Sequence, residues 1–504
     1  MNATLVGAVY AIVAAASAFA LVPRIASISF LVRCFAVWAS SALILFFVDG
    51  QGAMLTMAAV MLVLLIPLDP VQRIAFFLVA APSLPDYIQV YLPFPGINWL
   101  ILLTYYKVVV IVLLMPLLLR VVTGKGNAGG FSLADTCAVL YIAFSVLLVT
   151  ASLGFTAGPR FLIDQLIVLG VPYFVLSRLV RSQADVEFCL RAILLVCLIL
   201  AAVALLSTLK QWDFYRFKEP ASVFVIPDVR AGFIRIEATA NTHSLGYLLA
   251  IGILLLEYLK SSMRLGFIKV WLLRGMLLAG LLTTDSRGAL LGLVVAYAVY
   301  GVITVRKPGM RWTLLISLAA AVIGMGFWLV TTRDAATLDT YDTIGYRQLL
   351  LQVSIRHILE HPIIGDLGFF NDPSFAVLRQ GQDIIDITNF YLQVALSFGL
   401  VGLALLGGVI VPTMRALMRL AMGASAVSDE TRRLSAVIFA AVSGWLLLAA
   451  TTSDVALTFH LGLMLVALGR GLTRIEAAQA VSAPAPAVAP PLRAIGHLRR
   501  LESR

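Results

Sequence analysis

Long apolar runs dominate this 504-residue chain and decide what it can fold into. Hydrophobic residues make up 61% of the sequence and charged residues only 12%. The runs are about 18–22 residues long, which is the length that an α-helix needs to cross a bilayer. Lipid offers backbone groups no hydrogen bonds, so only helices and closed barrels span it, and the continuous Leu, Val and Ala runs lack the alternation of barrel strands. The sequence therefore predicts an all-α polytopic integral membrane protein, a helical bundle.

The number of runs predicts about 12 to 15 transmembrane helices. We expect them near 3–22, 28–48, 52–68, 73–92, 99–119, 133–152, 161–178, 187–208, 240–258, 267–283, 287–305, 312–331, 390–412, 432–450 and 454–471. The run at 73–92 is the least regular, because Pro82, Pro85 and Asp86 interrupt it. A kinked or broken helix is expected there.

The charge distribution predicts how the chain is oriented. The formal net charge is +11, but Lys and Arg gather in short loops, such as those with Arg178, Lys260 and Arg306. This is the pattern of the positive-inside rule, so the charge indicates topology and not nucleic-acid binding. Residues 1–475 then form one transmembrane domain, and the Ala- and Pro-rich tail, 476–504, is predicted to be disordered and cytoplasmic.

Cysteine usage gives no indication of a cofactor. Cys34, Cys137, Cys189 and Cys197 lie within or beside apolar runs and show no paired spacing. The sequence therefore suggests neither a disulfide framework nor a metal site, and no cofactor is predicted.

With this orientation, two long segments lie outside the cytoplasm, 209–239 and 332–389. The second has the spacing of an amphipathic helix over Gly345 to Glu360, which His361-Pro362 ends. It is expected to form a small extracytoplasmic subdomain that lies on the bundle.

A charged turn stands out on the same side of the membrane. Thr283-Thr284-Asp285-Ser286-Arg287-Gly288 separates two apolar runs, and so places Asp285 and Arg287 at a membrane face. An arginine buried there costs a few kcal/mol unless an anion or a carboxylate compensates it. Arg287 is therefore a candidate binding residue.

Four stretches in order resemble the O-antigen ligase and Wzy-type polysaccharide polymerase superfamily. They are RIEATANTHSLG at 235–246, TTDSRGALLGL at 283–293, GYRQLLLQVSIRHILEHPIIGDLGF at 345–369 and DITNFYLQVALSFGLVGL at 386–403. The resemblance covers roughly residues 130–420. It implies a membrane glycosyltransferase of the GT-C type that takes a glycan from a polyprenyl pyrophosphate and transfers it to an acceptor hydroxyl outside the cytoplasm.

This reaction releases a pyrophosphate, and guanidinium groups bind phosphate oxygens in pairs. Arg287 and Arg235 are the predicted pyrophosphate ligands, because each lies next to a span at the outer face. The resemblance also places the family's phosphate-binding arginines at these two positions. Arg347, at the start of the amphipathic helix, is predicted as a third. Asp285 and Asn389 are further candidate substrate contacts.

The acceptor hydroxyl needs a base. Ligase members of the superfamily usually carry a histidine just before the chain re-enters the membrane, whereas this chain has Thr388-Asn389 there. Asp386, His243 and His361 are the candidate bases. The Asp-x-x-Asn form resembles the exopolysaccharide polymerase branch, and so favours polymerisation over ligation to a lipid acceptor.

Each candidate also has a plainer interpretation. Arg287 could pair with Asp285 or reach the lipid head groups. Arg235 lies in a charged loop and fits a solvated surface, and His361 fits a helix stop. His243, Asp386 and Asn389 stand where residues cap helices.

Two other classes of function stay open, a transporter or flippase of lipid-linked oligosaccharides and a scaffold without catalysis. The absence of an internal repeat and the clustering of charge at one face favour chemistry over alternating access. The resemblance further implies a bacterial inner membrane location with a periplasmic or extracellular active site. The partners it implies are the lipid-linked glycan, a glycan acceptor, membrane lipid, and chain-length regulators and export proteins.

Overall fold

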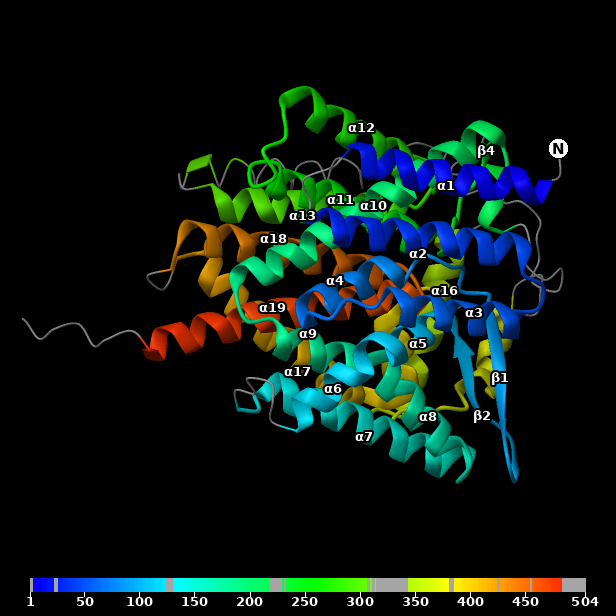
Figure 1. Ribbon diagram of the computed structural model, residues 1–504. Coiled ribbons are helices and arrows are strands. Elements are labelled where there is room, and N and C mark those ends of the chain that lie inside the picture. Colours follow the sequence, from blue (N-terminus) through cyan, green and yellow to red (C-terminus); the bar gives the residue numbers. More distant parts are fainter. Residues whose placement is uncertain are drawn as a thin grey trace, which may run out of the picture.

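The protein is a bundle of α-helices that lie roughly along one direction (Figure 1). The computed structural model describes residues 3–21, 26–123, 130–216, 229–230, 233–305, 309–310, 313, 343–379, 385–423, 427–453 and 456–482. Helix α16 and a β-hairpin lie at one end of the bundle, and the last helix, α19, leaves it at the other. The all-α polytopic class predicted from the sequence is confirmed.

The described part of the chain holds seventeen α-helices. They are α1 (Ala3–Leu21), α2 (Ile28–Phe47), α3 (Gln51–Leu65), α4 (Pro70–Ala80), α5 (Tyr105–Val109), α6 (Met115–Val122), α7 (Leu133–Leu153), α8 (Ala157–Gln165), α9 (Val171–Leu179), α10 (Gln183–Lys210), α11 (Thr242–Leu259), α12 (Phe267–Thr283), α13 (Arg287–Thr304), α16 (Thr343–Glu360), α17 (Phe390–Ala421), α18 (Asp429–Ala449) and α19 (Ala456–Ser482). The π-helical turns Val110–Leu114 and Leu166–Gly170 join α5 to α6 and α8 to α9. The strands are β1 (Gln89–Phe94) with β2 (Ile97–Thr104), and β3 (Val229–Arg230) with β4 (Phe233–Ile234).

Ten helical stretches among the described residues are long and apolar enough to cross a membrane. Two helices are apolar but shorter, Gln51–Leu65 and Pro70–Ala80. The predicted span 312–331 apart from residue 313, parts of both long loops, and the tail from 483 lie outside the described residues. Helix α19 extends to Ser482, so the start of the predicted tail, 476–482, is helical.

The interruption predicted within 73–92 is a β-hairpin and not a kinked helix, and the hairpin also takes up the start of the span predicted at 99–119. Helix α4 ends at Ala80, and the chain then forms the antiparallel hairpin β1–β2, in which Gln89 pairs with Thr104 and Phe94 with Ile97. The reason is the proline content: Pro82 and Pro85 cannot continue a helix, and Gly96 takes the positive φ of 83° that the turn requires. The membrane-spanning stretch predicted from residue 99 therefore begins at Tyr105 and extends to Val122.

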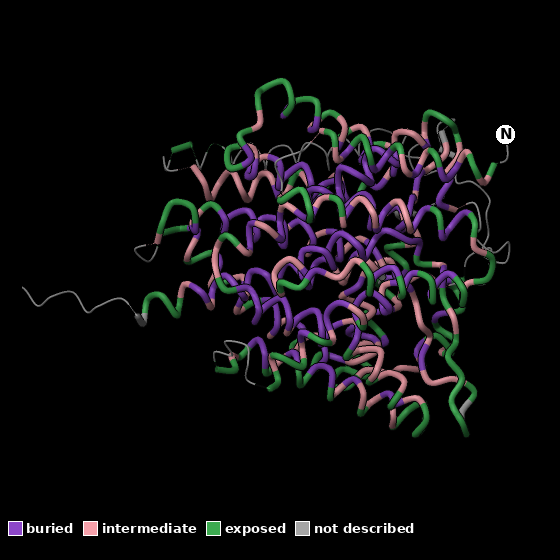
Figure 2. Tube along the Cα trace, in the orientation of Figure 1, coloured by how far each residue is buried: buried purple, intermediate pink, exposed green. Residues whose placement is uncertain are grey.

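The bundle is buried at its centre (Figure 2), and many large apolar side chains are exposed on its outside. Helix α10 lies in the interior, where most of its side chains are buried. In contrast, large apolar side chains such as Leu64 and Ile268 are 76% and 81% exposed. Such a surface would be unstable in water, and it fits contact with lipid tails.

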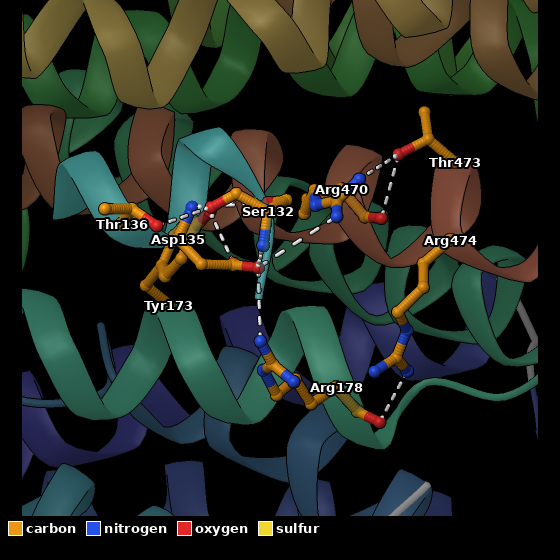
Figure 3. A network of polar contacts seen from close by, with 8 residues as sticks. All are labelled: Ser132, Asp135, Thr136, Tyr173, Arg178, Arg470, Thr473 and Arg474. Atoms are coloured by element: carbon orange, nitrogen blue, oxygen red, sulfur yellow. Dashed lines mark hydrogen bonds and ion pairs between the residues drawn. The ribbon is translucent and has the colours of Figure 1, made fainter. Parts of the chain in front are cut away.

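A buried ion-pair network ties three helices together near the cytoplasmic end predicted from the charges (Figure 3). Asp135 forms a capping box with Ser132 at the start of α7 and also accepts from Arg178 of α9 at 3.1 Å. Arg474 of α19 donates to the backbone oxygen of Arg178 at 2.7 Å. Arg178, predicted only as a topology determinant, is thus a buried structural residue. Breaking such a pair leaves an uncompensated buried charge.

Two of the stretches that carry the family resemblance meet backbone to backbone. Helix α17 is kinked at Gly399, whose φ is 63° and ψ −169°. At the kink, Leu400 and Val401 donate amide hydrogens to Pro362 and Ile363, and Asp366 donates to Leu396 at 2.7 Å. A Cβ atom at Gly365 would lie 2.5 Å from the Gly399 nitrogen. These glycines therefore dock the loop that follows α16 onto α17.

We expect Gly365→Ala to destabilise the protein, because the added methyl group overlaps the backbone of α17 and Gly365 also has a positive φ of 71°. Overpacking of this kind costs roughly 1–3 kcal/mol. Thermal unfolding in detergent measures the loss. Gly407→Ala is the matched control. Gly407 lies on α17, and no atom lies within 4 Å of its new Cβ. Equal melting temperatures of the two variants would contradict the docking role.

Candidate functional site

The charged turn lies where α12 ends and α13 begins. Asp285 adopts a left-handed conformation, with φ of 45°, and Ser286 precedes the first residue of α13. The turn reverses the chain within three residues, so Arg287 is exposed at a helix N-terminus. A helix N-terminus presents free N–H groups and a partial positive charge, which attract anions.

The segment that contains Arg235 is bonded to this turn. Ile236 donates its amide hydrogen to the Thr283 oxygen at 3.2 Å, and Arg235 Nε donates to the Thr284 oxygen at 2.8 Å. The structure therefore brings the two predicted pyrophosphate ligands, Arg235 and Arg287, to one turn.

His243 lies at the same turn. It is in the first turn of α11, where Asn241 caps the helix by accepting from Ser244. The imidazole Nδ1 is 3.2 Å from the Ser286 hydroxyl, next to Arg287. Two helix N-termini, those of α11 and α13, thus meet beside one imidazole.

Arg347 reaches this region from helix α16. Its guanidinium donates to the backbone oxygen of Thr451 at 3.1 Å. Thr451 packs over Gly288, since a Cβ there would lie 2.7 Å from the Thr451 hydroxyl oxygen. Arg235, Arg287 and Arg347 hence gather at the N-terminus of α13, and we call these three residues the arginine cluster.

The remaining candidates occupy other positions. Asn389 caps α17 by accepting from the amides of Tyr391 and Leu392, which is the plainer interpretation given above. Asp386 exchanges backbone hydrogen bonds with the hydroxyl of Tyr346, the residue before Arg347. His361 follows α16 at the far end from Arg347, and at 1.5 Å per residue this separates them by about 20 Å. The structure does not bring His361 to the arginine cluster.

A cavity of about 750 Å³ lies beside the arginine cluster. Its walls come from β1, β2, α5, α8, α17 and α19, and they include the aromatic side chains of Tyr105, Tyr106, Tyr141, Phe161 and Phe398. Thr239 and Ala240 also line it, and these two residues belong to the segment that runs from Arg235 to His243. The segment that links Arg235 to His243 therefore also forms part of the cavity wall.

The cavity is also lined by ionisable residues that were not selected from the sequence. Lys107 pairs with Asp164, and His460 stacks on Tyr106 with ring centroids 4.5 Å apart. Arg216 forms ion pairs with Glu237 and Asp86 and donates to the Ala240 oxygen at 2.9 Å. Lys107, Asp164 and His460 each stand inside a predicted span. Ionisable residues in spans mark functional sites, and this pattern could have identified them.

Asp213 holds the segment that carries Arg235. Its carboxylate accepts the amide hydrogens of Glu237 at 2.7 Å and of Ala238 at 3.0 Å. Burial raises the pKa of Asp213 to about 6, although these two bonds and Arg216 act in the opposite direction. Asp213 is therefore a positioning residue for the arginine cluster.

The region that carries this site resembles a known protein family. Residues 272–407 match the family model described as O-antigen ligase. The match confirms the resemblance to the O-antigen ligase and Wzy-type superfamily, and it spans Arg287, Arg347 and both docking glycines. No curated protein matches the chain. The O-antigen ligase match supports a membrane protein of the ligase or polymerase type that acts in glycan assembly on lipid-linked glycans.

We expect Asp213→Ala to lower the melting temperature, because it leaves two backbone amides without an acceptor, at a cost of about 1–3 kcal/mol. Asp213→Asn keeps an acceptor oxygen and serves as the matched control. The folded-state pKa of about 6 lies above the usual 3.8. Protonation of Asp213 therefore favours the folded state, and this contribution is lost as the pH rises through 6.

Melting temperatures measured from pH 4 to 8 test this dependence. The wild type should gain stability relative to Asp213→Asn as the pH falls from 7 to 4. Parallel profiles of the two proteins would show that Asp213 does not titrate in this range.

Proposed function

We propose that this protein is a glycosyltransferase that polymerises oligosaccharide repeat units carried on polyprenyl pyrophosphate at the extracytoplasmic face of a bacterial inner membrane. The observation that supports the proposal most directly is the arginine cluster at the N-terminus of α13, beside a large cavity. The O-antigen ligase match over residues 272–407 supports the same class of reaction.

In the proposed reaction, the acceptor hydroxyl oxygen attacks the anomeric carbon of the donor sugar. The new carbon–oxygen bond forms as the bond to the phosphate oxygen breaks, and the pyrophosphate leaves with the electron pair. Arg287, Arg235 and Arg347 would bind the departing charge, which grows in the transition state. The partial positive charge at the start of α13 adds to this effect.

The acceptor proton requires a base, and we favour His243 among the three candidates. Its imidazole contacts the hydroxyl of Ser286, the residue that precedes Arg287. Asp386 is the second candidate, because Tyr346 fixes its backbone beside Arg347. His361 is separated from the cluster by the length of α16.

The cavity is the proposed site for sugar residues. Its volume of about 750 Å³ lies in the usual range for ligand pockets, and aromatic rings together with a few polar groups line it. Polymerisation is favoured over ligation because Asn389 stands where ligases carry a histidine, and its side chain is occupied in capping α17. Chain-length regulators and export proteins are the partners we propose for such a polymerase.

A transporter of lipid-linked glycans is the second candidate function. The Lys107–Asp164 pair and His460 line a cavity between helices, which is also where transporters place their binding residues. The location of the three arginines at one end of the bundle favours a glycosyltransferase over a transporter.

Replacement of Arg287 tests the proposed function. We expect Arg287→Ala to lower the rate of transfer by about 10²–10³-fold, the usual effect of removing one donor to a developing negative charge. The melting temperature should stay unchanged, since the side chain is exposed. Arg287→Lys should recover part of the rate, because it keeps the charge but not the bidentate geometry.

The assay uses proteoliposomes with polyprenyl pyrophosphate-linked repeat units from the native host, and it resolves the products by size. Arg356→Ala, at an arginine on α16 whose side chain is 83% exposed, is the control. A ladder lost in Arg287→Ala supports the polymerase, and a single transfer to a lipid acceptor supports the ligase. Full activity of Arg287→Ala would refute the role of the cluster, and movement of the glycan lipid without product would favour the transporter.

A further inference from the structure

The extracytoplasmic subdomain has a small core of its own, and a histidine lies inside it. Leu350 and Val353 of α16 pack there with Phe369, Phe375 and Leu396. His357, on the same helix, is 2% exposed, and its ring packs edge-on against Phe375 with centroids 5.4 Å apart. A buried polar ring in an apolar core requires partners for its nitrogens.

Two carboxylates face the two nitrogens of His357. Nε2 lies 3.3 Å from Asp366 Oδ2, and Nδ1 lies 3.5 Å from Asp372 Oδ2. Within the described part of the chain, neither nitrogen has a partner with hydrogen-bond geometry. His361, one helical turn further on, places its ring 4.9 Å from that of His357. The ligand atoms of His357, His361 and Asp366 all lie within 4.8 Å of one another.

Local backbone bonds aim both carboxylates at this point. Asp366 Oδ1 accepts the Gly368 amide at 2.7 Å, and Asp372 Oδ1 accepts the Ser374 amide at 2.7 Å. In each residue one oxygen is fixed by the loop, and the other is directed at His357. The arrangement is therefore built into the loop between α16 and α17.

We propose that His357, His361 and Asp366 bind a divalent transition-metal ion of the zinc type, with a water molecule as the fourth ligand. Imidazole and carboxylate together suit zinc, which prefers four tetrahedral ligands at about 2.0–2.2 Å. Ligands at that distance are about 3.3–3.5 Å apart, and the His357–Asp366 separation of 3.3 Å fits this edge. Asp372, whose Oδ2 is 3.5 Å from Nδ1, would accept from Nδ1 once a bound ion fixes the ring, as carboxylates behind metal-binding histidines usually do.

An imidazolium ion held between two carboxylates is the competing interpretation. A charged ring would donate from both nitrogens with good geometry, which neither contact has. His361 also adds a second imidazole to the same point, and two charged rings would repel each other there. A shared metal ion satisfies both histidines together with Asp366.

The proposed ion would stabilise the subdomain. It would join the end of α16 to the loop at Asp366, whose amide is bonded to the kink of α17. The site lies at the end of α16 opposite Arg347, about 20 Å from it along the helix. Binding of the metal therefore does not depend on the proposed transfer reaction.

The test is a titration of the chelator-treated full-length protein in detergent with Co²⁺, which is followed by visible absorption. Elemental analysis measures the zinc content of the protein. We expect one ion per chain, with a tetrahedral cobalt spectrum. His361→Gln and Asp366→Asn should weaken binding at least tenfold. Asp372→Asn should weaken it about 10–100-fold through the orientation of His357. His243→Gln, a histidine outside this cluster, should bind as the wild type does.

His361 is exposed, so its replacement leaves the core of the subdomain intact. Added zinc should raise the melting temperature of the wild type and leave that of His361→Gln unchanged. Absence of stoichiometric binding, or equal binding by His361→Gln and Asp366→Asn, would overturn the proposal. A melting temperature that depends on pH but not on metal would support the imidazolium instead.

Discussion

The free carbonyl groups at the end of α12 determine where the candidate site forms. A helix leaves its last carbonyl groups without partners, and here the amide of Ile236 and the guanidinium of Arg235 bond to Thr283 and Thr284. This pairing brings the segment before α11 against the start of α13. As a result, His243 and Arg287 lie beside the same serine. The arginine cluster and one wall of the cavity both follow from this contact.

Helix α16 and the loop after it are attached to α17 by backbone hydrogen bonds as well as by apolar packing. Gly365 and Gly399 allow the chain after α16 to lie directly against the kink of α17. At its other end α16 is bonded to the end of α18 through Arg347 and Thr451. The helix is therefore held at both ends, one at the arginine cluster and one at the proposed metal site. This division separates a region suited to chemistry from a region suited to stability.

Sequence reasoning predicted the class of fold because the apolar runs leave few alternatives in lipid. It predicted an interruption at Pro82 and Pro85 but not its form, which is a hairpin that turns at Gly96. At the site it selected Arg235, Arg287, Arg347 and His243, since charged residues next to spans are conspicuous. It did not select Lys107, Asp164 and His460, because each is a single ionisable residue in an otherwise apolar run.

The sequence by itself determined that the chain forms a helical membrane bundle with charged segments at the ends of its helices, because hydropathy and charge depend on composition and order alone. The tertiary structure decided which of these segments meet. Arg235 and Arg287 are 52 positions apart, and Arg347 and Thr451 are 104 apart. Their proximity arises from the packing of α11 and α18 against α13 and of α16 against α17. The same is true of His357, whose neighbours Asp366 and Asp372 reach it only through the fold of the loop.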